Sequence, residues 1–171
     1  LRALCGQARE EGMGQALDRL ADEAAEGFWA RSALSIADTV FEQMWYETLH
    51  VQRCIFRAGA VSPGLFIPST IGDYTIWKGD YHTNYNFQQP FWGMAPGNHP
   101  ELMIPYIETM IDYFLPMGRM LAQRYYHVRG AFIQLTGFPM QMADDPICTV
   151  PMGRMLYMTG WAVNLFWLYY R

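Results

Sequence analysis

Apolar positions recur at helical spacing through much of the chain. The segment 14–28 places Leu17, Leu20, Ala24 and Phe28 on one face, with acidic residues between them. Such spacing predicts an amphipathic helix.

A second helix is predicted to begin after Asp38, because its carboxylate can accept the free N–H groups of a first helical turn. Gly59 is the expected stop of this helix. Its predicted apolar face comprises Phe41, Met44, Trp45, Leu49 and Ile55.

The helical pattern stops between residues 60 and 79. Prolines and glycines rule out a long helix there, namely Pro63, Gly64, Pro68, Gly72 and Gly79. Tyr74 and Ile76 alternate with polar neighbours, which predicts a short β-like segment near 73–78. Long connections of this kind often carry function.

Two helices are predicted in the next part of the chain. A short one covers about 84–93, and a long one runs from about Pro100 to His127. Pro105 and Pro116 are expected to kink or interrupt the long helix, because proline lacks the N–H that an inner helical position needs.

A second loop, 136–151, precedes a last helix that is predicted to begin near Pro151 or Met152 and to run to the end of the chain. The loop contains the adjacent carboxylates Asp144 and Asp145, which are read as a solvated acidic turn rather than an acid and base pair. Aromatic residues surround the last helix, namely Trp161, Phe166, Trp167, Tyr169 and Tyr170. The apolar run 155–170 is shorter than the roughly 20 residues that span a bilayer, so a helix buried on every side is predicted.

This order of elements predicts an all-α fold in a single domain, 1–171. Hydrophobic residues make up 51% of the chain, a share that excludes intrinsic disorder. The net charge of −4 and the single lysine, Lys78, argue against nucleic-acid binding and polybasic membrane recruitment.

No cofactor or metal is expected. Phosphate-loop and dinucleotide-binding motifs are absent from the sequence, and His50, His99 and His127 show no metal-binding spacing. The three cysteines form neither a disulfide framework nor a zinc motif; they are Cys5, Cys54 and Cys148.

The densest polar and aromatic segment is 77–92. Side-chain amides donate and accept hydrogen bonds together, which suits sugar hydroxyls or a water molecule. Asn84 and Asn86 can face one cavity, although Asn84 and His82 could instead cap the short helix. The candidate substrate-binding residues are Trp77, Asp80, Tyr81, His82, Gln88 and Trp92.

The run 82–92 (HTNYNFQQPFW) resembles the asparagine-pair motif of glycoside hydrolase family 95, the α-L-fucosidase family with an (α/α)6 barrel. Further likenesses follow in the family's order from about residue 70 to 171: Asn98 to Leu102, then Pro105, then Arg124 to Gly130, and finally Trp161, Trp167 and Tyr170.

The resemblance implies that 1–171 is the N-terminal to central part of a six-hairpin barrel domain. Asn84 and Asn86 would be the catalytic asparagines that position and activate the attacking water of an inverting hydrolase. The family's general-acid glutamate and base-side aspartate would lie beyond Arg171, so the chain alone is expected to be inactive and to expose apolar surface. Departures from the family pattern at Gly93 and at 131–136 leave the sugar open.

The predicted function is therefore hydrolysis of O-glycosidic bonds in oligo- or polysaccharides, with α-L-fucosides as one candidate class. The alternative is a non-catalytic helical module that binds carbohydrate or serves as a scaffold. A membrane-associated helical protein is a third hypothesis. The expected partner is a carbohydrate, without nucleic acid or membrane, and the sequence does not indicate the oligomeric state or the compartment.

Overall fold

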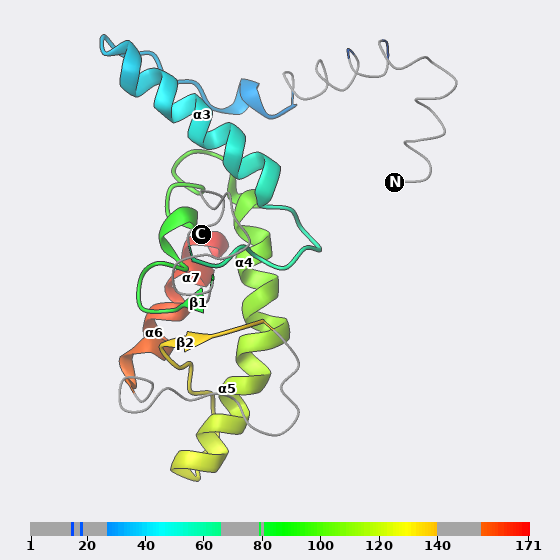
Figure 1. Ribbon diagram of the computed structural model, residues 1–171, viewed down its shortest axis with the longest axis vertical. Coiled ribbons are helices and arrows are strands. Elements are labelled where there is room, and N and C mark those ends of the chain that lie inside the picture. The colour runs from blue at the N-terminus through cyan, green and yellow to red at the C-terminus, as the bar shows by residue number, and fades with distance from the viewer. Residues whose placement is uncertain (1–14, 16–17, 19–26, 66–78, 80, 140–154) are drawn as a thin grey trace. The chain divides into compact units, whose positions relative to one another are not determined.

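The computed structural model describes residues 15, 18, 27–65, 79, 81–139 and 155–171. The chain divides into two compact units, Leu1–Glu42 and Gln43–Arg171. The described part is mostly helical, as the all-α class predicts (Figure 1). Most of the predicted helix 14–28, the β-like segment 73–78 and the acidic pair Asp144 and Asp145 lie outside the described residues.

Helix α3 extends over Thr39–Ile55, following a 3₁₀ turn at Trp29–Arg31. Asp38 caps it as predicted, because its Oδ1 accepts the N–H groups of Val40 at 3.0 Å and Phe41 at 3.3 Å. The helix ends before the predicted stop. Gly59 instead lies in the following turn with φ +76°, a conformation that suits glycine.

The predicted long helix from Pro100 to His127 is present as one continuous helical run that changes type along its length. It consists of a 3₁₀ turn Pro100–Met103, helix α4 Ile104–Thr109, a π-helical turn Met110–Phe114, helix α5 Leu115–Leu121 and a second π-helical turn Ala122–Tyr126. His127 ends the run in the left-handed conformation, with φ 55°.

The two prolines coincide with these changes of helix type, as predicted. Ile104 donates its N–H to the Glu101 carbonyl in the 3₁₀ pattern just before Pro105. Leu115 donates to the Met110 carbonyl in the wider π pattern just before Pro116. In a regular α-helix each proline ring would clash with the carbonyl four residues earlier. The change of helix type gives the ring the space that it needs.

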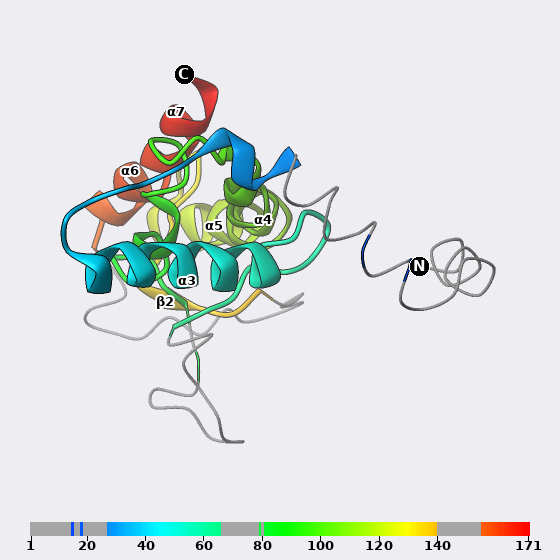
Figure 2. The ribbon, with the colours of Figure 1, turned by 90° about the horizontal axis from the view of Figure 1, so that it is seen from above.

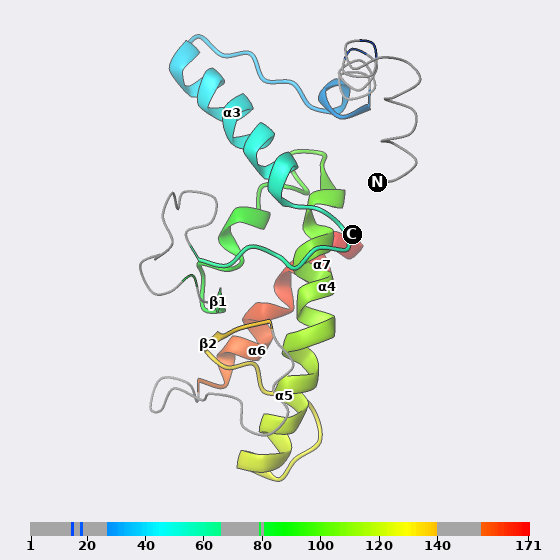
Figure 3. The same ribbon diagram turned by 45° about the vertical axis from the view of Figure 1, so that its right-hand side comes forward.

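The last helix differs from the prediction in its start and its continuity. Helix α6 covers Tyr157–Ala162 and α7 covers Asn164–Tyr170, and residues 155 and 156 precede the helix. The two helices run antiparallel to the long helical run and beside it (Figures 1 and 3).

The prediction that the last helix is buried on every side is wrong for the described structure. Met158, Ala162 and Leu165 are buried, whereas Trp167 and Tyr170 keep 57% and 82% of their surface exposed. The exposed apolar surface that was expected of this chain is therefore present on α7.

The short helix predicted over 84–93 is not a regular helix. Its residues form successive turns with a single 3₁₀ turn at Gln89–Phe91, because Phe91 and Trp92 each bond to the carbonyl three residues earlier. Pro90 has no N–H with which to continue an α-helical pattern.

A two-stranded antiparallel ladder joins distant parts of Gln43–Arg171. Strand β1, Tyr81–His82, pairs with β2, Thr136–Gly137. The long run and α6–α7 lie beside each other (Figure 2), and both contribute side chains to the core of this unit. Its largest fully buried side chains include Phe87, Phe91, Tyr106, Phe114, Leu121, Met158 and Leu165.

Candidate functional site

The asparagine pair lies on the tight turn that follows β1. Asn84 is exposed and Asn86 is half-buried. The Phe87 N–H bonds to the His82 carbonyl at 2.9 Å, and the Gln88 N–H bonds to the Tyr85 carbonyl at 3.0 Å. The turn therefore holds both asparagines within one short, hydrogen-bonded stretch of backbone. The side chains of the two asparagines reach the surface.

Buried polar groups hold the two ends of this turn. The Thr83 hydroxyl donates to the Gln134 carbonyl at 2.6 Å, and the Thr83 N–H donates to the Leu135 carbonyl at 2.8 Å. Gln88 Nε2 donates to the Thr83 carbonyl at 2.7 Å. Both side chains are fully buried, so they face the interior of the chain.

Tyr81 is also buried, at the start of the same segment. Its hydroxyl donates to the Ser62 carbonyl at 2.5 Å, and its ring lies edge-on to Phe87 at 5.0 Å. Burial raises the pKa of Tyr81 to about 12, because the phenolate would lose its hydration. The phenol therefore stays protonated and acts as a donor to the backbone.

Aromatic rings connect the asparagine turn to α6. Tyr85 contacts Trp92 edge-on with ring centroids 5.3 Å apart, and Trp92 contacts Trp161 in the same way at 5.2 Å. Tyr85 remains 48% exposed, while both tryptophans are half-buried. The asparagines thus lie next to an aromatic surface of the kind that packs against the apolar face of a sugar ring.

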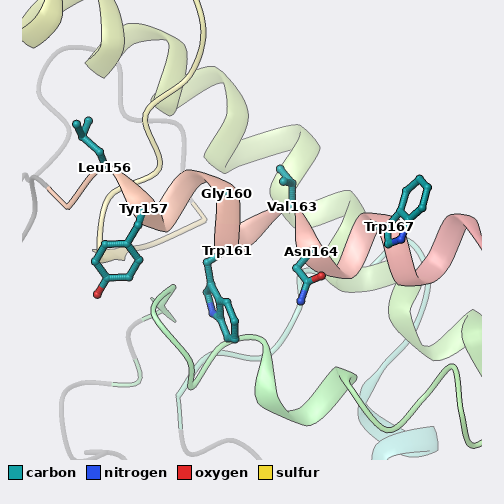
Figure 4. Close-up of a pocket in the computed structure, with 7 residues that line it drawn as sticks. All are labelled: Leu156, Tyr157, Gly160, Trp161, Val163, Asn164 and Trp167. Atoms are coloured by element: carbon teal, nitrogen blue, oxygen red, sulfur yellow. The ribbon is translucent and has the colours of Figure 1, made fainter.

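A shallow hollow of about 770 Å³ continues this surface over α6 and α7. Tyr157, Trp161 and Asn164 project from one side of these helices, whereas Val163 and Trp167 project from the other (Figure 4). Among the described residues that line it, the hollow combines aromatic rings with a single amide, and none of these residues is charged.

Among the described residues, no group of three or more His, Cys, Asp or Glu side chains is placed so that it could hold a metal ion. His99 is fully buried, and its Nδ1 lies 3.3 Å from Glu101 Oε1. Glu101 occupies the first turn of the long run, where a carboxylate interacts favourably with the helix dipole. Within the same residues no helix is long and apolar enough to cross a membrane.

The structure brings together part of the predicted site. Asn84, Asn86, His82 and Trp92 lie on or beside the turn with some exposed surface. Tyr81 and Gln88 belong to the same segment but point into the interior. Trp77 and Asp80 lie outside the described residues.

The sequence pattern did not indicate how Thr83, Tyr85 and Trp161 contribute to this region. Thr83 and Tyr85 are neighbours of the asparagines in the sequence, so their proximity could have been inferred. Trp161 was predicted as part of a buried helix and of the family resemblance, and no local signal links it to Trp92, because their contact joins distant parts of the chain.

A comparison with protein families finds one match relevant to this site. The model described as the glycosyl hydrolase family 95 catalytic domain matches residues 67–171. The match covers more than half of the chain and confirms the resemblance that was noted over about 70–171. No curated protein and no solved structure matches the chain.

Proposed function

The chain belongs to glycosyl hydrolase family 95, and on that basis we propose that it takes part in hydrolysing O-glycosidic bonds of oligo- or polysaccharides, with Asn84 and Asn86 at the cleavage point. The observation that carries this proposal is the turn itself. It presents two asparagines with exposed surface beside Tyr85 and Trp92.

The chemistry of the amide limits what these asparagines do. Neither side chain titrates, so neither serves as a general acid or base. An amide oxygen can accept a hydrogen bond from the attacking water, and an amide NH₂ can donate to a sugar hydroxyl. Asn84 and Asn86 would therefore hold the water or the sugar ring in the geometry of attack.

The proposed reaction is inverting hydrolysis. The water oxygen bonds to the anomeric carbon as the bond from that carbon to the leaving oxygen breaks. A carboxylic acid protonates the leaving oxygen, and a carboxylate on the opposite face takes a proton from the water. The resemblance assigns these roles to a glutamate and an aspartate that are not matched by any residue of 1–171.

The remaining proposed contacts concern recognition of the sugar. His82 and Trp92 adjoin the turn and are half-buried, and Trp77 and Asp80 are proposed from the sequence. Aromatic rings would pack on the apolar face of the sugar, while the imidazole and carboxylate would bond to its hydroxyls. An α-L-fucoside is the first substrate to test, followed by glycosides of other sugars.

The experiment compares Asn84→Ala and Asn86→Ala with the wild type in the full-length protein. Each substitution should lower kcat by about 100-fold, the scale on which loss of one positioned polar group acts, and should leave the melting temperature nearly unchanged. Gln89→Ala is the matched control, because Gln89 is an exposed amide directly after the turn.

Unchanged hydrolysis in both asparagine variants would show that the assigned role is wrong. A full-length wild-type protein that binds sugars without turning over any glycoside would instead favour the non-catalytic carbohydrate-binding alternative.

A further inference from the structure

Two fully buried polar side chains, Thr83 and Gln88, flank the turn that carries Asn84 and Asn86. Burying a hydroxyl or an amide costs free energy unless the group is hydrogen-bonded. Both bond to backbone carbonyls of or beside the turn, so their bonds fix backbone positions.

Thr83 anchors the start of the turn to the segment before β2. Its hydroxyl approaches the Gln134 carbonyl at 2.6 Å and the Leu135 carbonyl at 3.2 Å, and its N–H bonds to Leu135 at 2.8 Å. That segment in turn lies close against the long run, where the Phe132 N–H bonds to the Gly118 carbonyl at 2.8 Å. The start of the turn is thereby connected to the long run through backbone hydrogen bonds.

Gln88 closes the other end. Its Nε2 donates to the Thr83 carbonyl at 2.7 Å, so the amide spans the loop on which both asparagines lie. Its side chain also hydrogen-bonds to Tyr106 of α4, which lowers the pKa of the phenol against the larger rise that burial causes. Tyr106 in turn bonds to the Ala162 carbonyl at 2.7 Å. One chain of buried polar contacts therefore links the turn, the long run and α6.

We propose that Thr83 and Gln88 are positioning residues, which hold the turn so that Asn84 and Asn86 meet the water and sugar in the reactive geometry. This inference rests on the proposed function and extends it to the residues that hold the turn in place. It also assigns Gln88 a role different from the one predicted from its sequence, because its fully buried amide bonds to the backbone instead of facing a substrate.

The physical basis is the sensitivity of catalysis to geometry. Displacing a catalytic group by about 1 Å can lower the rate about 100-fold. Asn84 is exposed and has little packing of its own. Its place therefore depends on the backbone that carries it, and that backbone depends on the bonds of Thr83 and Gln88.

The test uses Thr83→Val in the full-length protein, since valine keeps the shape of threonine and removes the hydroxyl. Thr109→Val is the matched control: Thr109 is equally buried, and its Oγ1 accepts the Ser62 N–H at 2.8 Å, outside the turn that carries the asparagines. Both variants should lose some thermal stability. Only Thr83→Val should lower kcat, by about 10- to 100-fold, with little change in KM. Thr83→Ser, which keeps the hydroxyl, should have a kcat close to that of the wild type.

A second variant tests the same role if Thr83→Val does not fold. Gln88→Met keeps the length of the side chain and removes the amide donor, so it should lower kcat in the same way. Hydrogen exchange supplies a readout besides activity. The amides of Phe87 and Gln88 should exchange faster in Thr83→Val and remain unchanged in Thr109→Val.

A double substitution separates this inference from the proposed function. If Thr83 acts through Asn84, adding Thr83→Val to Asn84→Ala should cause little further loss of kcat. Full activity of Asn84→Ala and Asn86→Ala would overturn the proposed function. An inactive Asn84→Ala together with a Thr83→Val that is as active as Thr109→Val would overturn the positioning role alone.

Discussion

The hydroxyl of Tyr106 donates a hydrogen bond of 2.7 Å to the carbonyl of Ala162, at the end of α6. The break after this residue makes the carbonyl available, because the Phe166 N–H bonds to Val163 at 3.1 Å. Tyr106 thus compensates for a helical hydrogen bond that the break removes, and it does so from the middle of a different helix.

Replacing Tyr106 by phenylalanine should destabilise the protein by about 1–3 kcal/mol, because the Ala162 carbonyl loses its donor in the interior. Chemical denaturation monitored by circular dichroism measures this change. Tyr157→Phe is the control and should change stability by no more than about 0.5 kcal/mol, since Tyr157 is 64% exposed. Equal effects of the two substitutions would contradict the structural role of the Tyr106 bond.

Gly137 in β2 should tolerate no larger residue. A Cβ atom at this position would lie 2.9 Å from Cε1 of Phe114, whose ring is fully buried and has little room to move. Gly137→Ala should therefore destabilise the fold by about 1–3 kcal/mol, the usual effect of overpacking. A melting temperature equal to that of the wild type would show that the Phe114 ring can move to make room for the Cβ atom.

Gly160 in α6 offers the opposite case. A Cβ atom there meets nothing within 4 Å, and alanine favours the helix over glycine by about 1 kcal/mol. Gly160→Ala should raise the melting temperature, and a decrease would indicate that some group approaches α6 closely at this position.

Alkaline pH should weaken the fold through Tyr81. Its pKa is 10.0 in the unfolded chain and about 12 in the folded state, so the folded state holds the phenolic proton more tightly. This contribution to stability is complete below pH 10 and is lost as the pH rises towards 12. Denaturation midpoints measured across this interval should fall less steeply in Tyr81→Phe, although buried Tyr106 adds to the fall in both proteins. Identical slopes would contradict the assignment.

The exposed rings of α7 should make the chain 1–171 prone to association. Trp167 and Tyr170 expose 57% and 82% of their surface on a helix whose other side is buried. Substituting both residues with glutamine should reduce binding of a hydrophobic dye and increase the monomer fraction in size-exclusion chromatography. Unchanged dye binding would locate the accessible apolar surface elsewhere.

Features with a local signal could be predicted from the sequence. Asp38 marks the start of α3 because its carboxylate caps the adjacent N–H groups. Pro105 and Pro116 mark the changes of helix type because the missing N–H and the ring act on neighbouring turns. The composition of the asparagine turn likewise indicated where exposed amides and aromatic rings would gather.

Features that depend on distant contacts could not be predicted in this way. Neither glycine nor proline marks the break at Val163, where the bond from Tyr106 takes the place of a helical one. The pairing of β1 with β2 involves two residues on each strand, too few for an alternating pattern. Gln88 is as polar as its exposed neighbour Gln89, and only the fold shows that its amide is buried.

The edge-to-face contact between Trp92 and Trp161 also has an optical consequence. Two indoles with centroids 5.2 Å apart are close enough for their excited states to couple, and each belongs to a different segment of the fold. The near-ultraviolet circular dichroism spectrum should therefore contain a signal from the coupled pair. This signal depends on how the asparagine turn is placed against α6. The protein thus contains an intrinsic spectroscopic probe located beside the residues proposed for catalysis.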